Sequence, residues 1–158
     1  MLGLPNNTIF AGICHSPAGG DVVGAAPHIL SLKNAHMAYI VAVIQQGDVA
    51  TTTLTPMQAA SVAGVTKALT NTVPIAACLD YATSDELVAT TAAKSYALDA
   101  ALKKKIVIFA IDPLNALDQA NEYDCITLDT STSHANNIVA GLLFVVPRYN
   151  PPLSAIAD

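Results

Sequence analysis

Short apolar runs separated by turn-forming residues constrain the fold of this chain more than any other feature. Residues 105–111 and 138–146 are apolar almost throughout, and residues 123–130 alternate between polar and apolar side chains. Such runs, bounded by Asn, Asp, Gly and Pro, are typical of β-strands. A run that is apolar on both faces predicts a strand that is buried on both faces. The chain is therefore expected to fold around β-sheets.

The spacing of these runs predicts an all-β domain. Strands are expected over residues 28–33, 37–46, 50–59, 73–81, 95–102, 105–111, 123–130 and 138–146. One short helix is expected over residues 83–93, because Thr83 and Glu86 have the spacing of a capping box. These elements favour an antiparallel two-sheet β-sandwich, with the jelly roll as candidate topology.

The first 27 residues differ in composition from the rest. They are rich in Gly and Pro and hold one short β-like run, so we expect an extended N-terminal arm over residues 1–27. The alternative is a terminus that packs along its own domain. Residues 28–158 form the expected sandwich domain, with an extended C-terminal tail, and this domain is expected to fold without residues 1–20.

The surface of the protein is expected to carry little charge. Charged residues make up 12% of the chain and apolar residues 53%, whereas soluble domains average about 25% charged residues. Protein interfaces are depleted in charge at their cores, so part of the surface is expected to be covered by neighbours. A monomer with a neutral, Thr-rich surface is the alternative.

Nucleic acid and membrane are not expected partners. The net charge is −5, and the basic cluster Lys103, Lys104 and Lys105 is expected to guard a strand against edge pairing. The longest apolar stretch, residues 37–44, is far shorter than the roughly 20 residues of a membrane-spanning helix. No secretory signal is recognised, so we expect synthesis in a cytoplasm.

No motif predicts catalysis, a cofactor or a metal. The cysteines are odd in number and lack CxxC spacing, the histidines lack a helical i, i+4 pair, and there is no GxSxG elbow. The acidic residues of the last third do not have EF-hand spacing. Among them, Asp112 precedes Pro113 and is expected to form a turn by bonding the backbone two residues on. The sequence therefore predicts a protein without enzymatic activity.

Several short motifs resemble a family of small virion proteins of tailed bacteriophages, encoded near the major capsid protein. The resemblance covers residues 30–149 and rests on Ser31-Leu32-Lys33-Asn34-Ala35, Leu54-Thr55-Pro56-Met57-Gln58-Ala59, Ala68-Leu69-Thr70, Ile111-Asp112-Pro113, Leu117-Asp118, Tyr123-Asp124-Cys125-Ile126-Thr127-Leu128 and Pro147-Arg148-Tyr149. The Pro- and Gly-rich start of this chain is longer than the family pattern.

The resemblance implies a cement or decoration subunit on the capsid surface of the virion, made in the host cytoplasm. Its expected partners are the major capsid protein and further copies of itself, as a dimer or trimer. The residues expected to bind a partner lie near the two ends of the chain: Thr8, Ile9, Phe10, Ile13, Arg148, Tyr149, Pro151 and Pro152. A tail or connector component shares this composition, and a carbohydrate-binding sandwich is a further alternative, although Trp is absent.

Overall fold

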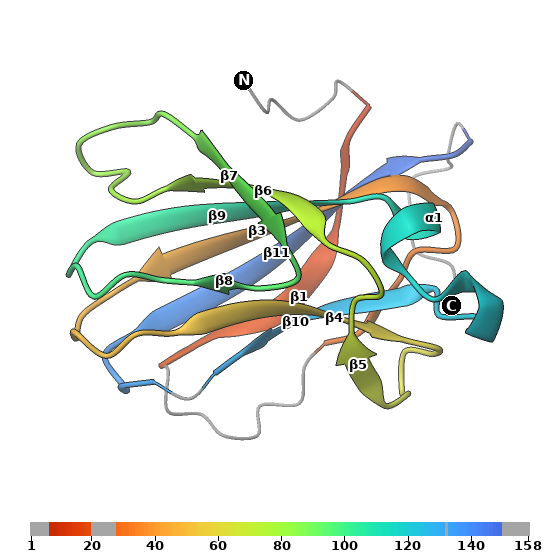
Figure 1. Ribbon diagram of the computed structural model, residues 1–158, viewed down its shortest axis with the longest axis horizontal. Coiled ribbons are helices and arrows are strands. Elements are labelled where there is room, and N and C mark those ends of the chain that lie inside the picture. Colours follow the sequence, from red (N-terminus) through yellow and green to blue (C-terminus); the bar gives the residue numbers. More distant parts are fainter. Residues whose placement is uncertain (1–6, 20–27, 132, 150–158) are drawn as a thin grey trace.

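The computed structural model describes residues 7–19, 28–131 and 133–149, and they form a two-sheet antiparallel β-sandwich (Figure 1). Short helical turns lie at one end, α1 (Pro113–Ala116) and the 3-10 helix η1 (Gln119–Asn121). The strands are β1 (Ile9–Gly19), β2 (Leu30–Ser31), β3 (Ala35–Gln45), β4 (Thr53–Ala59), β5 (Thr66–Ala68), β6 (Val73–Cys78), β7 (Val88–Ala93), β8 (Tyr96–Ala97), β9 (Lys104–Ile111), β10 (Cys125–Thr130) and β11 (Ile138–Pro147).

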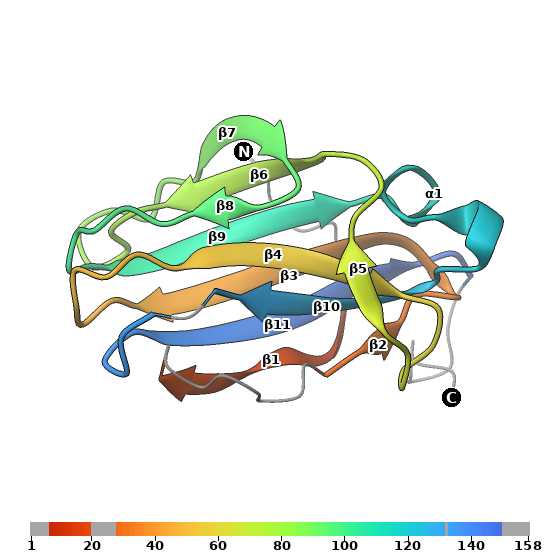
Figure 2. The ribbon, with the colours of Figure 1, turned by 60° about the horizontal axis from the view of Figure 1, so that its bottom comes forward.

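The two sheets have different sizes. The larger sheet has six strands in the order β1-β11-β3-β9-β6-β7, and the smaller has the order β2-β10-β4-β5, with β8 also paired to β4. Figure 2 shows β4 and β10 of the smaller sheet in front of the larger sheet and nearly aligned with its strands. The predicted all-β sandwich is confirmed.

Strand pairing is nested along the chain. The first strand β1 pairs with the last strand β11, β2 pairs with β10, β3 with β9, and β4 with β8. Such a rolled-up hairpin, shared between two sheets, is a jelly-roll topology. Strands β5 to β7 lie at the tip of the nested pairing, and β6 and β7 extend the larger sheet beyond β9.

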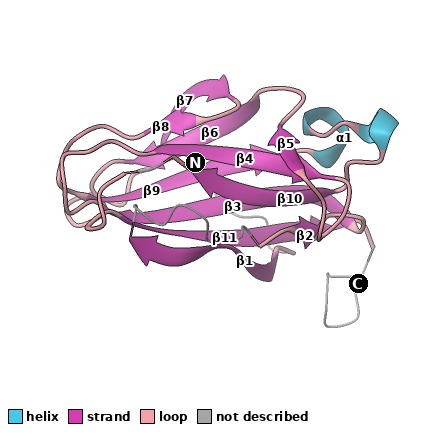
Figure 3. Ribbon diagram, turned by 90° about the horizontal axis from the view of Figure 1, so that it is seen from below, coloured by secondary structure: helices cyan, strands magenta, loops and turns pink. Residues whose placement is uncertain are grey.

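The core lies between the sheets and is built from one face of each strand. Ile40, Phe109 and Leu143 point inward from the larger sheet and Leu128 from the smaller one, all with no exposed surface. Their positions follow the period of two of a β-strand, in which neighbours point to opposite faces. The two layers are seen together from below in Figure 3.

The helix predicted over residues 83–93 is wrong. Ser84 uses its hydroxyl oxygen to accept a hydrogen bond from the Glu86 amide, 3.2 Å away, which makes a local turn and not a helix cap. From Val88 the chain runs as β7 and pairs with β6. Val and Thr favour strands through their branched Cβ, and here tertiary pairing outweighs the capping signal. The helix lies instead after β9.

The arm expected over residues 1–27 contains a strand that belongs to the sandwich. β1 pairs with β11 along its length, and Ala11 and Cys14 are part of the buried core. The Gly and Pro residues of this segment weakened the sequence pattern of a strand. The strand forms because β11 supplies hydrogen-bond partners for its backbone. Residues 1–6 and 20–27 lie outside the described residues. Deleting residues 1–20 would remove β1 and part of the core, so we now expect this deletion to destabilise the domain.

Two further predictions have simple outcomes. Asp112 caps α1, and its carboxylate accepts a hydrogen bond from the Leu114 amide 3.0 Å away, as expected for a turn former. The lysine cluster does not guard a sheet edge, because β9 is an interior strand and Lys105 is fully buried. No helix of the described residues is both long and apolar enough to cross a membrane.

Candidate partner-binding surface

The two groups of predicted binding residues meet at one corner of the molecule. Ile9 is opposite Val145 and Phe10 is opposite Phe144 in the β1–β11 pair, so the start of β1 lies beside the end of β11. Thr8, Ile9 and Phe10 therefore lie near Arg148 and Tyr149. We call these five residues the corner patch. Ile13 lies further along β1, opposite Leu142, and Pro151 and Pro152 are outside the described residues.

The corner patch has a fixed part and an exposed part. Arg148 is anchored, because its backbone amide donates to the Asn34 oxygen at 2.8 Å and its Nε donates to the Ala35 oxygen at 2.9 Å. Tyr149 is 77% exposed and Phe10 is 52% exposed. An aromatic side chain held open to solvent beside an anchored Arg has the composition of an interface hot spot.

β1 is one of the two edge strands of the larger sheet among the described residues, and its pairing with β11 is irregular. Register shifts interrupt the β1–β11 pairing between Phe10 and Gly12, between Ile13 and His15, and between His15 and Ala18. Bulges of this kind oppose pairing with a further strand. We therefore expect a partner to contact the exposed side chains of β1 and not to pair with its backbone.

The outer face of the larger sheet is a second candidate surface, and sequence reasoning missed it. Side chains facing away from the core on β3 and β11, among them Tyr39, Val41, Leu142 and Phe144, are half-buried. On the same strands the inward Ile40 and Leu143 have no exposed surface. The outward side chains of β9 and β6, among them Ile108 and Ala76, are buried, so the exposed part of this face lies mainly on β1, β11 and β3.

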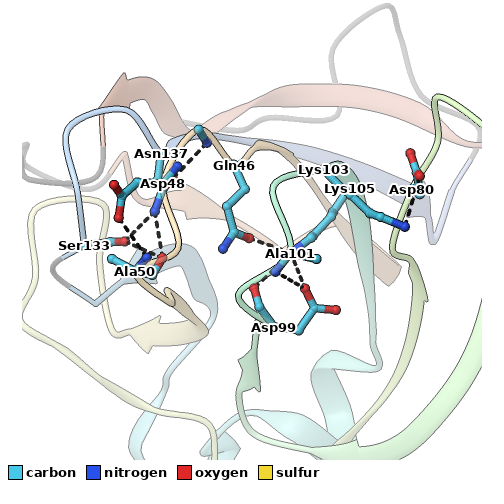
Figure 4. A network of polar contacts seen from close by, with 11 residues as sticks. Gln46, Asp48, Ala50, Asp80, Asp99, Ala101, Lys103, Lys105, Ser133 and Asn137 are labelled. Carbon is cyan, nitrogen blue, oxygen red and sulfur yellow. Dashed lines mark hydrogen bonds and ion pairs between the residues drawn. The ribbon is translucent and has the colours of Figure 1, made fainter.

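A polar network at the opposite end of the sandwich has a structural role (Figure 4). The Lys105 ammonium, with no exposed surface, donates to Gln46 Oε1 at 2.5 Å, to Asp99 Oδ1 at 2.6 Å and to the Asp99 backbone oxygen at 2.9 Å. The hydrogen bond from Lys105 holds the pKa of Asp99 below its usual value. The network ties the β8–β9 connection to the end of β3.

Asn137 joins two loops beside this network. Its Oδ1 accepts from the amides of Gly47 and Asp48 at 2.9 and 2.8 Å, and its Nδ2 donates to the Ala50 oxygen at 2.7 Å and to Ser133 Oγ at 2.9 Å. All hydrogen-bonding positions of the amide are occupied, which suits a side chain that is 1% exposed. This end of the sandwich is thus built for rigidity.

Asp118, Cys14 and His15 are titratable groups outside this network whose surroundings are well defined. Asp118 pairs with Lys67 at 2.5 Å, and this hydrogen bond lowers the Asp118 pKa. Burial raises the pKa of the Cys14 thiol to about 12, and His15 contacts the Leu128 oxygen through Nδ1 at 3.2 Å. Within residues 7–19, 28–131 and 133–149, no group of three or more His, Cys, Asp or Glu side chains could hold a metal ion.

Comparison with known proteins adds no relative. No protein-family model, no curated protein and no solved structure matches this chain. The protein is therefore classified by its fold alone, a jelly-roll β-sandwich.

Proposed function

We propose that this chain is a non-enzymatic structural subunit of a tailed-bacteriophage virion, a cement or decoration protein that binds and stabilises the major capsid protein lattice. The observation that carries the proposal is a charge-poor β-sandwich in which Phe10 and Tyr149, near one corner, expose aromatic side chains. The motif resemblance over residues 30–149 supports the same function. Jelly rolls also serve in lectin domains, so the fold alone does not choose between these roles.

The physical role of such a subunit follows from mass action. A protein that binds the assembled lattice and not its separated subunits stabilises the lattice in proportion to its affinity and concentration. The corner patch supplies what repeated docking needs: an anchored cation, Arg148, and exposed aromatic area next to it. Aromatic and Arg side chains dominate the binding energy of protein interfaces.

The test uses particles that lack the chain, produced from a phage with the gene deleted. Purified wild-type protein is expected to bind these particles and to raise the temperature at which they release DNA. Failure of the wild-type protein to bind either the head or any other part of the particle would overturn the proposal. Binding at the tail alone would replace cement by the tail or connector role.

The corner patch is tested with the variant Tyr149→Ser. Because Tyr149 is 77% exposed, the substitution leaves the fold intact and is expected to weaken binding to particles at least tenfold, about 1.4 kcal/mol. The matched control is Val49→Ser, also an exposed apolar residue, 64% exposed. Val49 follows the end of β3 that lies opposite Ile138, far from the corner. Equal binding by both variants would remove the corner patch from the account.

A further inference from the structure

A small polar pocket lies at the end of the sandwich where α1 is found (Figure 1). Its volume is about 200 Å³, and segments that are distant in the sequence line it. The lining residues are Leu32 and Lys33 after β2, Pro113 of α1, Gln119 of η1, Asp124 before β10 and Arg148 after β11. We call it the Arg148 pocket. Because Arg148 also belongs to the corner patch, the pocket adjoins the surface proposed to bind a partner.

Arg148 is the single arginine of the chain, and part of its guanidinium group is unused. Its Nε donates to the Ala35 oxygen at 2.9 Å and its backbone amide donates to the Asn34 oxygen at 2.8 Å, which fixes the position of the side chain. Its two terminal nitrogens donate no hydrogen bond to any group of the described residues. The paired donors of an arginine match the two oxygens of a carboxylate in geometry and in charge.

The charges that line the pocket do not cancel. Arg148 and Lys33 are cations and Asp124 is an anion, so the three groups sum to +1, in a chain whose net charge is −5. Lys33 Nζ lies 3.8 Å from Asp124 Oδ2, and the Lys33 side chain is 68% exposed. An exposed ion pair at this distance is weak, so the Lys33 ammonium is free to turn to an incoming group.

The uncharged walls of the pocket are already in place. Gln119 Nε2 donates to the Pro113 oxygen at 3.0 Å and to the Tyr123 oxygen at 3.3 Å, so both of its hydrogens are used. The Leu32 amide donates to the Asp124 oxygen at 2.7 Å and joins the β2 side to the β10 side. A preformed pocket loses little conformational entropy when a ligand enters it.

From this we infer that the Arg148 pocket receives the carboxylate of an Asp or Glu side chain of a partner protein. One carboxylate brings the net charge of the lining to zero and supplies acceptors to the terminal nitrogens of Arg148. A nucleic acid would bring a row of phosphates against a chain of net charge −5. The identity of the partner rests on the proposed function, whereas the preference of the pocket for a carboxylate does not.

The preference is tested on the purified full-length chain with two probes of the same shape, N-acetylglutamate N-methylamide and its glutamine counterpart. Because the chain has one arginine, the Arg148 Nε–H group gives a single arginine signal in NH correlation spectra. The glutamate probe is expected to shift this signal with a dissociation constant at least tenfold lower than that of the glutamine probe, a difference of about 1.4 kcal/mol. Equal affinities of the two probes, or no shift with either, would overturn the inference.

The variant Lys33→Gln removes the second cation from an exposed side chain and is expected to weaken binding of the glutamate probe about threefold. The matched control is Lys104→Gln, exposed at the opposite end of the sandwich. Lys104 pairs with Gln45, the last residue of β3, whereas the first residue of β3, Ala35, holds Arg148. The control is expected to bind the probe as the wild type does. Equal weakening by both variants would reduce the effect to the overall charge and overturn the inference.

Two further measurements separate the possible occupants. Asp158→Asn is expected to leave the Arg148 signal of the free protein unchanged; a shift would assign the pocket to the chain's own carboxyl end and overturn the inference. In the particle assay Lys33→Gln is expected to bind less tightly than Lys104→Gln, and equal binding would contradict a carboxylate of the partner in the pocket. A chain that prefers the glutamate probe but binds no particle would support the carboxylate site and overturn the proposed function alone.

Discussion

The buried Lys105 network allows a prediction with a defined order of effects. Lys105 has no exposed surface, whereas the Asp99 side chain is 48% exposed. Removing one partner of a buried ion pair costs most when the remaining charge stays buried. Asp99→Ala leaves the Lys105 ammonium in place with two hydrogen bonds, to Gln46 Oε1 and to the Asp99 backbone oxygen. Lys105→Met leaves a carboxylate that turns to water.

The magnitudes follow from these contacts. Breaking a fully buried pair costs about 3–5 kcal/mol, but water reaches Asp99, so Asp99→Ala is expected to cost about 2 kcal/mol, the value of one hydrogen bond to a charged group. Lys105→Met leaves Gln46 Oε1 without its hydrogen-bond donor and is expected to lower the free energy of unfolding by about 1 kcal/mol. Asp99→Asn keeps an acceptor and lies between the two. The control Lys104→Met, at an exposed position of the same strand, is expected within about 0.5 kcal/mol of wild type.

Urea unfolding followed by circular dichroism measures these differences. The pH dependence gives an independent check, because Lys105 holds the Asp99 pKa below its usual value. A carboxylate with a lowered native pKa contributes stability above its unfolded pKa of about 3.9 and loses it as the pH falls through the native value. The gap between wild type and Asp99→Asn should therefore close at acid pH. A larger cost for Lys105→Met than for Asp99→Ala would refute the reasoning.

Two further predictions concern the place where β1 and β11 approach the smaller sheet. Gly141→Ala is expected to destabilise the protein by about 1–3 kcal/mol in the same urea assay, because an added Cβ would lie 2.9 Å from His15 Cβ and from Leu128 Cδ2; an unchanged midpoint would show that β1 moves aside freely. Cys14 and Cys125, whose thiol pKa is raised to about 12 by burial, are expected to resist iodoacetamide at pH 8 in the folded protein and to react in urea. Mass spectrometry of tryptic peptides checks this, and rapid labelling of either native thiol would contradict the packing described for them.

The strands with apolar residues on both faces were the easiest to predict from sequence. Residues 105–111 and 138–146 correspond to β9 and β11 with shifts of one residue. Pro56 falls between the segments of β4 that pair with β8 and with β5, where no strand on that side needs the amide that proline lacks. Local chemistry was sufficient at these positions because it agrees with the tertiary environment.

Elsewhere the sequence signal was local and the deciding interaction was distant. β1 depends on β11, more than a hundred residues away, for its hydrogen bonds. Lys105 was expected to guard a strand against edge pairing, but it is buried, and its ammonium donates to Gln46 and Asp99, which come from other loops. The corner patch likewise joins the two ends of the chain, since the nested pairing places β1 beside β11. The residues of the corner patch could be selected from the sequence, but only the strand topology shows that they lie close together.

We propose that this chain is a capsid cement subunit, and the copy number in purified virions tests this proposal most directly. Quantitative mass spectrometry of particles from the source would give the ratio of this chain to the major capsid protein. We expect a near-stoichiometric ratio, because a cement subunit covers the whole lattice. A few copies per particle, or none, would contradict it.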